Sequence, residues 1–476
     1  MKKNDLIELI IEDYAFEGKG VAKINFPGDD GTKKKYVIFV NNAYPGDKVL
    51  CKIYKIKKSY AEAAVEKILI SSSFRTVAKC RYFGVCGGCK QQDMEYKYQL
   101  EMKRKQVKDI FSRIGGFLNL EIEEILPSSK IYFYRNKMEF SFADKRWLTP
   151  LEIVNHDKIT DKNFALGLHI PGTFDKVLDI TECHLQSEIS NQILNETRKF
   201  FKSNDTSIYS TKTHTGYLRN LIIRQSASTS DLMINLVTSE NNERLFTKYF
   251  QNLSRKYPEI TTIVNNINTK MGQTSIGDYE KIYWGNGYIF DKIGNYSFRI
   301  SANSFFQTNT LQAEHLYKTA LEFADFSGNE IVYDLYSGAG TIAIFISGAV
   351  LSVWGFENIL QANKDAEYNS ILNKVKNTKY VMADLNKSFL NHVREHNIPL
   401  PDVIIADPPR SGMNPRTLSD IIKLNPRKIV YISCNPATQV RDIKILYDAG
   451  FNISRIKPID MFPHTFHIEN IVLLTK

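Results

Sequence analysis

The last third of the chain repeats one pattern, and this pattern restricts the possible folds more than any other feature. From about residue 300, short apolar runs typical of buried strands alternate with turns and with longer segments typical of helices. The strand-like runs are 331–335, 353–356, 379–382, 403–406, 429–432 and 471–474. Strands that alternate with helices form a doubly wound, mostly parallel sheet. We therefore expect an α/β domain over residues 301–476.

A glycine turn follows the first of these runs. Residues 334–341 read Asp-Leu-Tyr-Ser-Gly-Ala-Gly-Thr, and Gly338 and Gly340 permit a tight turn and the close approach of a ligand. Glu357 and Asp384 end the next two runs, where acids can bind ribose hydroxyls and an adenine amine. Each acid alone can also cap a helix. Together they predict an adenosine pocket.

The motif Asp407-Pro-Pro-Arg410 follows the fourth run. The order of acids, glycine turn and Asp-Pro-Pro resembles class I methyltransferases, whose ligand is S-adenosylmethionine. In that fold an Asp-Pro-Pro followed by an aromatic residue often marks methylation of an amino group. Arg410 in place of the aromatic residue weakens this interpretation, which stays open as an alternative.

Cys434 is the sharpest local signal for chemistry. It ends the fifth run, while Asn435 fits a helix N-cap and Pro436 the first helical position. A thiol at a helix N-terminus is expected to have a lowered pKa, although inert buried cysteines are common. A thiolate that adds to C6 of uracil makes C5 nucleophilic enough to accept a methyl group, and a base must then remove the C5 proton. Glu469, just before the last run, is the candidate base.

Four other cysteines form a second candidate site. Cys80, Cys86 and Cys89 lie in one loop, and Cys183 is far away in the sequence. Three thiolates in a loop and a distant fourth are common for iron–sulfur clusters, while zinc is the main alternative. The sixth cysteine, Cys51, is expected to be structural. His464 and His467 are either metal ligands or, in our preferred interpretation, packing or substrate contacts.

The first 300 residues predict two further domains. Residues 1–70 contain short strand-like runs, a turn signal and no helix-like segment, which predicts a small OB-like β-barrel. Residues 71–300 combine the cysteine loop, a charged helix over 95–114 and further strand-like runs, which predicts a mixed α+β central domain of unresolved topology. The expected fold class is therefore multidomain α/β.

Charge and hydropathy bear on partners and location. Lysines crowd the first quarter of the chain, and the formal net charge of +10 favours a polyanionic partner. We see neither a signal peptide nor an apolar stretch long enough for a membrane span. We expect a cytoplasmic protein with no membrane association and no obligate protein partner.

These residues together resemble the RNA (uracil-5-)-methyltransferase family, in the branch with an N-terminal TRAM domain and a [4Fe-4S] cluster. The resemblance covers nearly the whole chain. Residues 305–309, Phe-Phe-Gln-Thr-Asn, match the family's Phe-Phe-Gln segment. Residues 134–137 and Arg219-Asn220 look like its central-domain motifs, which are expected to face RNA. Ser337 stands where many relatives carry cysteine, which puts little in doubt.

The resemblance implies a C-terminal class I Rossmann-like methyltransferase domain, S-adenosyl-L-methionine as methyl donor, and a role for each matched residue. Cys434 would be the nucleophile and Glu469 the base. The matched cofactor-binding residues are Gln307, Tyr336, Glu357, Asp384 and Asp407. The matched cluster ligands are Cys80, Cys86, Cys89 and Cys183.

The resemblance also bears on the RNA target. Relatives with a TRAM barrel usually modify large-subunit ribosomal RNA, whereas the bacterial transfer-RNA enzymes usually lack this barrel. We therefore favour a uridine of 23S rRNA. A uridine of tRNA, or a non-catalytic RNA-binding protein with an iron–sulfur cluster, are the alternatives.

Overall fold

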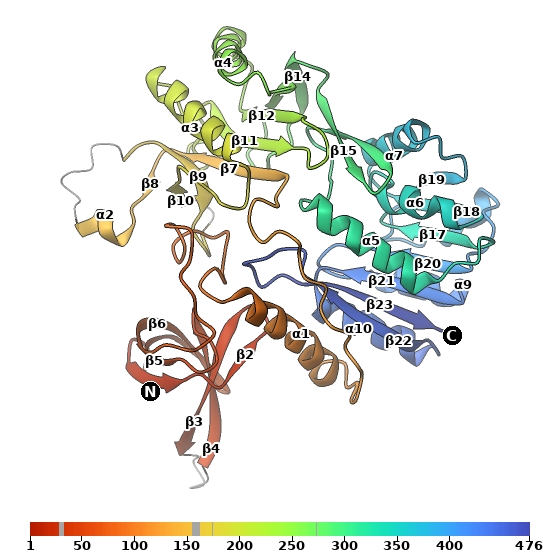
Figure 1. Ribbon diagram of the computed structural model, residues 1–476, viewed down its shortest axis with the longest axis horizontal. Coiled ribbons are helices and arrows are strands. Elements are labelled where there is room, and N and C mark those ends of the chain that lie inside the picture. The colour runs from red at the N-terminus through yellow and green to blue at the C-terminus, as the bar shows by residue number, and fades with distance from the viewer. Residues whose placement is uncertain (28–32, 155–161, 174, 273) are drawn as a thin grey trace.

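The fold is that of a computed structural model, which describes residues 1–27, 33–154, 162–173, 175–272 and 274–476. In the described part of the chain, three large sheets follow one another, with a two-stranded sheet between the second and the third. Figure 1 shows the three large sheets as a lower, an upper and a right-hand part. Helix α1 (Tyr96–Arg113) lies where the lower part meets the other two. Among the described residues, no helix combines the length and apolarity that crossing a bilayer requires.

The N-terminal sheet has six strands in the order β1-β5-β6-β4-β3-β2. Their bounds are β1 Leu6–Ile10, β2 Asp13–Ala15, β3 Lys19–Pro27, β4 Lys33–Asn41, β5 Lys48–Ile56 and β6 Tyr60–Ile70. Alternating apolar side chains, such as Val49, Cys51 and Ile53 of β5, fill its core.

The expected closed barrel is wrong in one respect. Strands β1 and β2 stay at the two edges of the N-terminal sheet, and no pairing joins them within the described residues. Strand β2 has only three residues and lies against α1 instead, where Lys105 forms a 2.7 Å ion pair with Asp13. Because a helix covers this edge, the sheet does not need to close on itself.

The central domain is built on an eight-stranded sheet in the order β14-β13-β12-β11-β7-β9-β10-β8, which the sequence did not reveal. Its strands are β7 Lys137–Ala143, β8 Arg146–Trp147, β9 Ala165–His169, β10 Val177–Asp179, β11 Leu218–Gln225, β12 Leu232–Thr238, β13 Thr262–Ile267 and β14 Tyr279–Trp284. Its helices are α2 Pro150–Val154, α3 Glu188–Ser203 and α4 Glu243–Lys256. Side chains of α3 and α4 share one core with the sheet, and Figure 1 shows these two helices beside each other.

The C-terminal sheet has seven strands in the order β19-β18-β17-β20-β21-β23-β22. They are β17 Ile331–Leu335, β18 Ser352–Glu357, β19 Thr378–Met382, β20 Val403–Ala406, β21 Lys428–Ser433, β22 Asn452–Ile459 and β23 Glu469–Thr475. All six expected strands are present, and β22 is additional. Only β23 runs against its neighbours, and the strand order reverses direction at β17.

Helices cover this sheet on both faces, as expected for a doubly wound fold (Figure 1). They are α5 Thr310–Ala324, α6 Thr341–Ile346, α7 Leu360–Leu372, α8 Leu390–Glu395, α9 Pro415–Leu424 and α10 Pro436–Asp448, with a 3₁₀ turn at Ser347–Ala349. The hairpin of β15 (Tyr288–Ile293) and β16 (Tyr296–Ser301) precedes residue 301 but packs into the core of this sheet.

Candidate active site and cysteine cavity

The carboxyl ends of parallel strands bring the predicted residues to one edge of the C-terminal sheet. Tyr336 follows β17, Glu357 ends β18, Asp407 follows β20 and Cys434 follows β21. These strands pair in parallel and in register, so their carboxyl ends lie side by side. In open α/β sheets the ligand binds outside this edge, where the strand order reverses.

The glycine turn between β17 and α6 leaves room for a ligand. Tyr336, Gly338 and Gly340 all adopt positive φ, of 66°, 52° and 76°. A Cβ atom added to Gly338 would meet nothing within 4 Å, so the space above this residue is open. A carboxylate oxygen of Asp334 and the hydroxyl of Ser337 are buried there without a described partner. An open cradle and two unpaired polar atoms fit a polar cofactor such as S-adenosylmethionine.

The two acids of the predicted adenosine pocket differ in their surroundings. The Glu357 carboxylate accepts hydrogen bonds from the backbone N–H groups of Gly338 (3.0 Å), Asn358 (2.8 Å) and Ile359 (2.9 Å). It is thereby tied to the glycine turn. Asp384 lies two residues beyond β19, is partly exposed, and accepts from the Asn386 backbone N–H at 3.0 Å. This bond is the main cause of its lowered pKa.

Gln307 lies in a segment that the central domain holds in place. The Asn136 amide donates to its backbone carbonyl at 2.8 Å, and Asn309 donates to the Met461 carbonyl at 3.0 Å. The neighbouring Phe305 ring is 73% exposed, whereas Phe306 is buried. The segment therefore presents one aromatic ring and one amide at the junction of two domains.

Cys434 stands at the predicted junction between β21 and α10. The Asn435 side chain caps the helix by accepting from the Ala437 N–H at 3.1 Å, and Pro436 is the first helical residue. The expected low pKa is wrong, because burial and the nearby carboxylates of Glu469 and Asp407 raise the pKa of the thiol to about 11. Arg410 opposes this shift but does not reverse it. One partial helix charge is weaker than burial combined with two anionic neighbours.

Glu469 lies beside Cys434 because β21 and β23 are antiparallel neighbours. Their register pairs Ser433 with Asn470. Continued by one residue, this register places Cys434 opposite Glu469, at a Cα separation of about 5 Å. The Glu469 side chain is 5% exposed. Burial and the charge of Asp407 raise the pKa of its carboxyl well above the usual value, against the effect of Arg410. Burial likewise raises the pKa of Asp407 to about 7.

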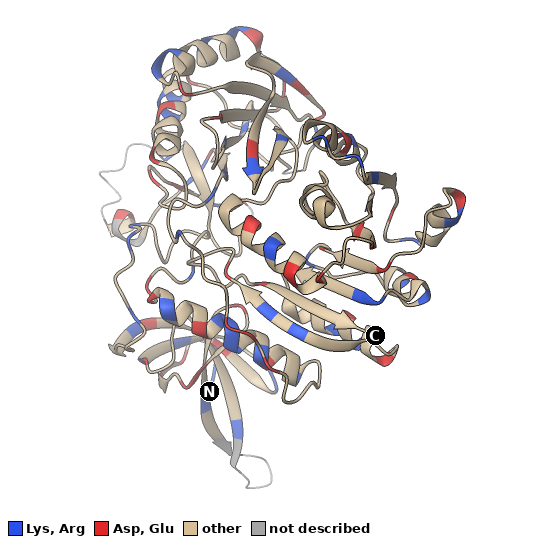
Figure 2. Cartoon of the chain, turned by 45° about the vertical axis from the view of Figure 1, so that its right-hand side comes forward, with Lys and Arg blue, Asp and Glu red and all other residues tan. Residues whose placement is uncertain are grey.

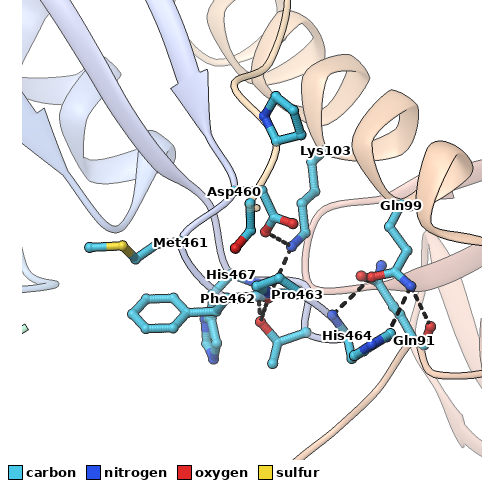
Figure 3. A network of polar contacts seen from close by, with 12 residues as sticks. Gln91, Gln99, Lys103, Asp460, Met461, Phe462, Pro463, His464 and His467 are labelled. Atoms are coloured by element: carbon cyan, nitrogen blue, oxygen red, sulfur yellow. Dashed lines mark hydrogen bonds and ion pairs between the residues drawn. The ribbon is translucent and has the colours of Figure 1, made fainter. Parts of the chain in front are cut away.

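The loop between β22 and β23, residues 460–468, is anchored by a buried ion pair (Figure 3). We call it the hairpin loop. Lys103 of α1 lies 2.6 Å from Asp460, and both side chains are completely buried. Lys103 also donates to the Phe462 carbonyl at 3.2 Å, and the Tyr96 hydroxyl donates to Asp460 at 2.8 Å. The hairpin loop, whose last residue is followed by Glu469, is thus fixed to α1.

The two histidines of the hairpin loop, His464 and His467, make polar and packing contacts inside the protein. His464 exchanges hydrogen bonds with Gln99, from its backbone N–H (2.9 Å) and at ring Nδ1 (3.2 Å), as Figure 3 shows. Burial is the first cause that lowers the pKa of both His464 and His467 to about 4. The one side-chain group among the described residues that is close enough for a single metal ion is His392, Glu395 and His396, on the exposed side of α8.

The cysteine loop contacts the same hairpin loop. The backbone N–H groups of Lys90 and Gln91 donate to the His464 carbonyl at 2.8 and 3.0 Å. The Tyr134 hydroxyl donates to the Pro463 carbonyl at 3.1 Å. Two elements of the first 140 residues therefore meet the segment that carries the candidate base.

The four predicted thiols line one cavity of about 210 Å³, which also has Gln92 and Arg135 in its wall. No three of the sulfur atoms lie within 4.8 Å of one another. A tetrahedral zinc ion with Zn–S bonds of about 2.3 Å would bring them to about 3.8 Å. The spacing therefore fits a larger group, such as an iron–sulfur cube, better than a single zinc ion.

Hydrogen bonds hold the thiols in place. The Gly88 N–H donates to Cys86 Sγ at 3.4 Å, and the Gln92 amide donates to Cys89 Sγ at 3.2 Å. Burial raises the pKa of Cys86 to about 11 and that of Cys89 to about 12. A bound metal would replace these protons. Cys51 lies apart in the core of the N-terminal sheet, in agreement with the expected structural role.

Three side chains of the central-domain motifs take part in internal contacts. Tyr134, Asn136 and Arg219 are all buried. The Arg219 guanidinium donates to the carbonyls of Asn268 and Lys270, both at 2.7 Å. These side chains mainly hold loops in place, and such internal hydrogen bonding is invisible in a sequence motif.

Comparison with known proteins gives the family. The TRAM domain matches residues 2–65, and the family described as tRNA (Uracil-5-)-methyltransferase matches residues 227–476. The chain belongs to the tRNA (uracil-5-)-methyltransferase family. As a family member it is an S-adenosylmethionine-dependent methyltransferase that acts on RNA.

Relatives of this methyltransferase match it over nearly its whole length. An uncharacterized RNA methyltransferase of Bacteroides thetaiotaomicron is 44% identical and covers 97% of this chain and 99% of its own. One from Chlorobaculum tepidum is 39% identical, with 99% and 96% covered. The solved structure of Pyrococcus abyssi tRNA (uracil-54, C5)-methyltransferase with S-adenosyl-L-homocysteine has a TM-score of 0.73 and 28% identity, and covers 98% of this chain and 100% of its own.

Two contributors to the methyltransferase site were missed by sequence reasoning. Arg410 was noted only because it replaces an aromatic residue, yet its charge acts on Cys434, Glu469 and His467. Lys103 belonged to a lysine-rich helix and gave no sign that it was buried. Its position in the sequence, 357 residues before its partner Asp460, leaves no local signal.

Proposed function

We propose that the protein methylates C5 of a uridine in RNA, with Cys434 as the covalent nucleophile and Glu469 as the base. The observation that supports this most is the position of the two side chains beside the open glycine turn. Cys434 and Glu469 are the direct neighbours of Ser433 and Asn470, which pair between β21 and β23. A thiol beside a carboxyl of raised pKa is the arrangement that addition and elimination at a pyrimidine require.

The proposed reaction balances as follows. The Cys434 sulfur bonds to C6 of the uracil ring, and the electron pair of the C5–C6 double bond becomes available at C5. C5 would then bond to the methyl carbon of S-adenosylmethionine, the bond between that carbon and the sulfonium sulfur would break, and S-adenosylhomocysteine would leave. The positive charge of the bound methyl donor would also favour the thiolate form of Cys434. Glu469 then removes the proton from C5, the double bond re-forms, and the sulfur leaves C6. Cys434 is regenerated and one proton is released.

We further propose that Gln307, Tyr336, Glu357, Asp384 and Asp407 bind S-adenosylmethionine. The open space above Gly338 and the fixed carboxylate of Glu357 support this assignment. The partly exposed position of Asp384 suits a residue that meets a ligand from the solvent side.

We propose a [4Fe-4S] cluster on Cys80, Cys86, Cys89 and Cys183. The shared cavity and the wide sulfur spacing support it. The cluster would stabilise the loop whose backbone holds His464, and with it the hairpin loop before Glu469. Anaerobically purified protein should be brown and contain iron. Cys183→Ser should lose the iron, whereas Cys51→Ala should keep it. Colourless protein with stoichiometric zinc would refute the assignment.

For the RNA target we propose 23S rRNA, on the resemblance to TRAM-containing ribosomal RNA enzymes. The match to the Pyrococcus abyssi tRNA (uracil-54, C5)-methyltransferase favours tRNA as the second candidate, because this match also spans the N-terminal domain. Mass spectrometry of both RNA fractions from cells lacking the gene decides between them. A 5-methyluridine lost from one site of 23S rRNA supports the first target, and one lost from tRNA supports the second.

A further inference from the structure

A second pocket lies in the central domain, apart from the glycine turn and next to the cysteine cavity, with which it shares Glu139 in its wall. It has a volume of about 170 Å³, which suits one nucleobase rather than a base pair. Side chains from β7, β11, the end of β9 and the loop before β11 line it. The main lining residues are Glu139, Ser141, His169, Tyr209, Arg219 and Asn220.

The pocket has a fixed aromatic wall. The Tyr209 ring lies against the Arg219 guanidinium, 4.1 Å from the ring centroid. The guanidinium is itself held by the carbonyls of Asn268 and Lys270. The Tyr209 hydroxyl is bonded to His214 at 3.2 Å. A ring that is already held loses little entropy when a base stacks on it.

Polar groups form the opposite side of the pocket. The Ser141 hydroxyl is 2.9 Å from His169 Nε2 and accepts from the Asn220 amide at 3.2 Å. The Glu139 carboxylate is exposed and accepts from the Ser275 hydroxyl at 3.1 Å through one oxygen. Among the described residues of the lining, Glu139 is the acid, and the guanidinium of Arg219 is already engaged by two backbone carbonyls and the Tyr209 ring. The Glu139 carboxylate therefore favours a ligand with hydrogen-bond donors.

Strand β7, which lines the pocket, begins beside the segment that carries Gln307. Asn136, which holds the Gln307 carbonyl, immediately precedes β7. Glu139 and Ser141 follow on alternate positions of that strand. The four residue steps of strand from Lys137 to Ser141 span about 13 Å. A few nucleotides of single-stranded RNA can cover that distance.

We infer that this pocket binds a guanine base of the RNA, a few nucleotides from the methylated uridine. Guanine alone carries adjacent N1–H and N2–H donors on its Watson–Crick edge, which match one carboxylate. Uracil would turn its carbonyl oxygens toward Glu139, and cytosine and adenine offer one amino group beside an acceptor. The inference rests on RNA binding and does not depend on the role proposed for Cys434.

The test compares binding of the full-length protein to labelled oligouridylate and to oligomers with one guanine at each position, by fluorescence anisotropy. We expect one guanine position to tighten binding by about tenfold. Glu139→Gln should abolish this gain, and Tyr209→Ala should weaken it, whereas Glu259→Gln, an exposed glutamate outside the pocket, should leave it unchanged.

Two outcomes overturn the inference: no guanine position tightens binding, or the gain persists in Glu139→Gln. A tritium-release assay on RNA with 5-tritiated uridine separates this result from the proposed function. If the wild-type protein shows no guanine preference but its tritium release depends on Cys434, only the inference about the pocket is refuted. If tritium release does not depend on Cys434 but the guanine preference is present, only the mechanism proposed for Cys434 is refuted.

Discussion

A thiol placed between two carboxyl groups is protected from ionisation until the charge around it changes. Cys434 has this environment, since burial, Glu469 and Asp407 all raise its pKa, to about 11. We therefore expect alkylation and oxidation of the free protein to be slow near neutral pH, because the thiolate is the reactive form. We expect binding of the cationic methyl donor to shift this balance.

The raised pKa leads to a prediction on alkylation of the unliganded protein. The rate at which iodoacetamide modifies Cys434 should rise about tenfold per pH unit from pH 7 toward the pKa near 11. Glu469→Gln removes one anionic neighbour and should lower the pKa of the thiol, so alkylation at pH 8 should be faster. Quantitative mass spectrometry of the Cys434 peptide measures both. A rate that is flat above pH 7 would contradict the high pKa.

Glu469 carries a second prediction at this scale. With Glu469→Gln the C5 proton stays on the ring, so the sulfur cannot leave and protein and RNA should remain covalently joined. Denaturing gel electrophoresis with labelled RNA should show the joined species. Glu367→Gln, on an exposed face of α7, is the matched control and should turn over normally. If Glu469→Gln releases methylated RNA at the normal rate, another group is the base.

The hairpin loop contacts two distant parts of the chain, α1 and the cysteine loop. α1 holds it through Lys103 and Gln99, and the cysteine loop holds it through the His464 carbonyl. Ile459, at the end of β22, pairs with Glu469, so Asp460 lies next to the position of the candidate base. Buried ion pairs often fix geometry more than they add stability.

Replacing one partner of this ion pair should therefore have two effects. Lys103→Met leaves Asp460 buried without its cation, which should cost about 3–5 kcal/mol and lower the melting temperature. The combined Lys103→Met and Asp460→Leu protein should regain stability. We expect it to keep a reduced kcat with a KM for RNA close to normal, because Glu469 is displaced. Calorimetry and steady-state kinetics measure these effects, with partly exposed Lys105→Met as control. Full recovery of kcat in the double variant would contradict a positioning role.

The sequence predicted elements well where local pattern decides them. The run 331–335 matches β17, and Asn435-Pro436 marks the start of α10. β22 was missed because its residues alternate with Ser454, Arg455 and Lys457 and lack an apolar run. The edge of the C-terminal sheet at which the site lies could be predicted from the parallel strands alone. The pKa of Cys434 did not follow, because it depends on burial and on neighbours from β20 and β23.

At the scale of the whole molecule, charge is more balanced than the sequence suggests. Figure 2 shows that basic and acidic residues are distributed over all three parts of the chain. Several lysines of the N-terminal quarter form ion pairs, for example Lys48 with Glu8 and Lys55 with Glu62. The order of the central sheet was equally beyond the sequence, because β7 and β11 pair across about 80 residues of chain. Such long-range pairing has no local signature.

RNA binding by the N-terminal sheet gives a prediction at this scale. Lys52, Lys57 and Lys58 are exposed there. If they contact phosphates, replacing all three by glutamine should weaken RNA binding and reduce the slope of log K against log salt by about 2. Lys423→Gln on α9 should leave the slope unchanged. Titrations from 50 to 200 mM salt, a range of about fourfold, measure it. An unaltered slope would place the RNA elsewhere.

The central claim is that one sulfur atom carries the reaction. Its most direct test is mass spectrometry of target RNA treated with S-adenosylmethionine and either the wild-type protein or Cys434→Ala. The wild-type protein should produce 5-methyluridine, and the folded variant, which still binds the cofactor, should produce none. Formation of 5-methyluridine by Cys434→Ala at a rate near that of the wild type would contradict the mechanism.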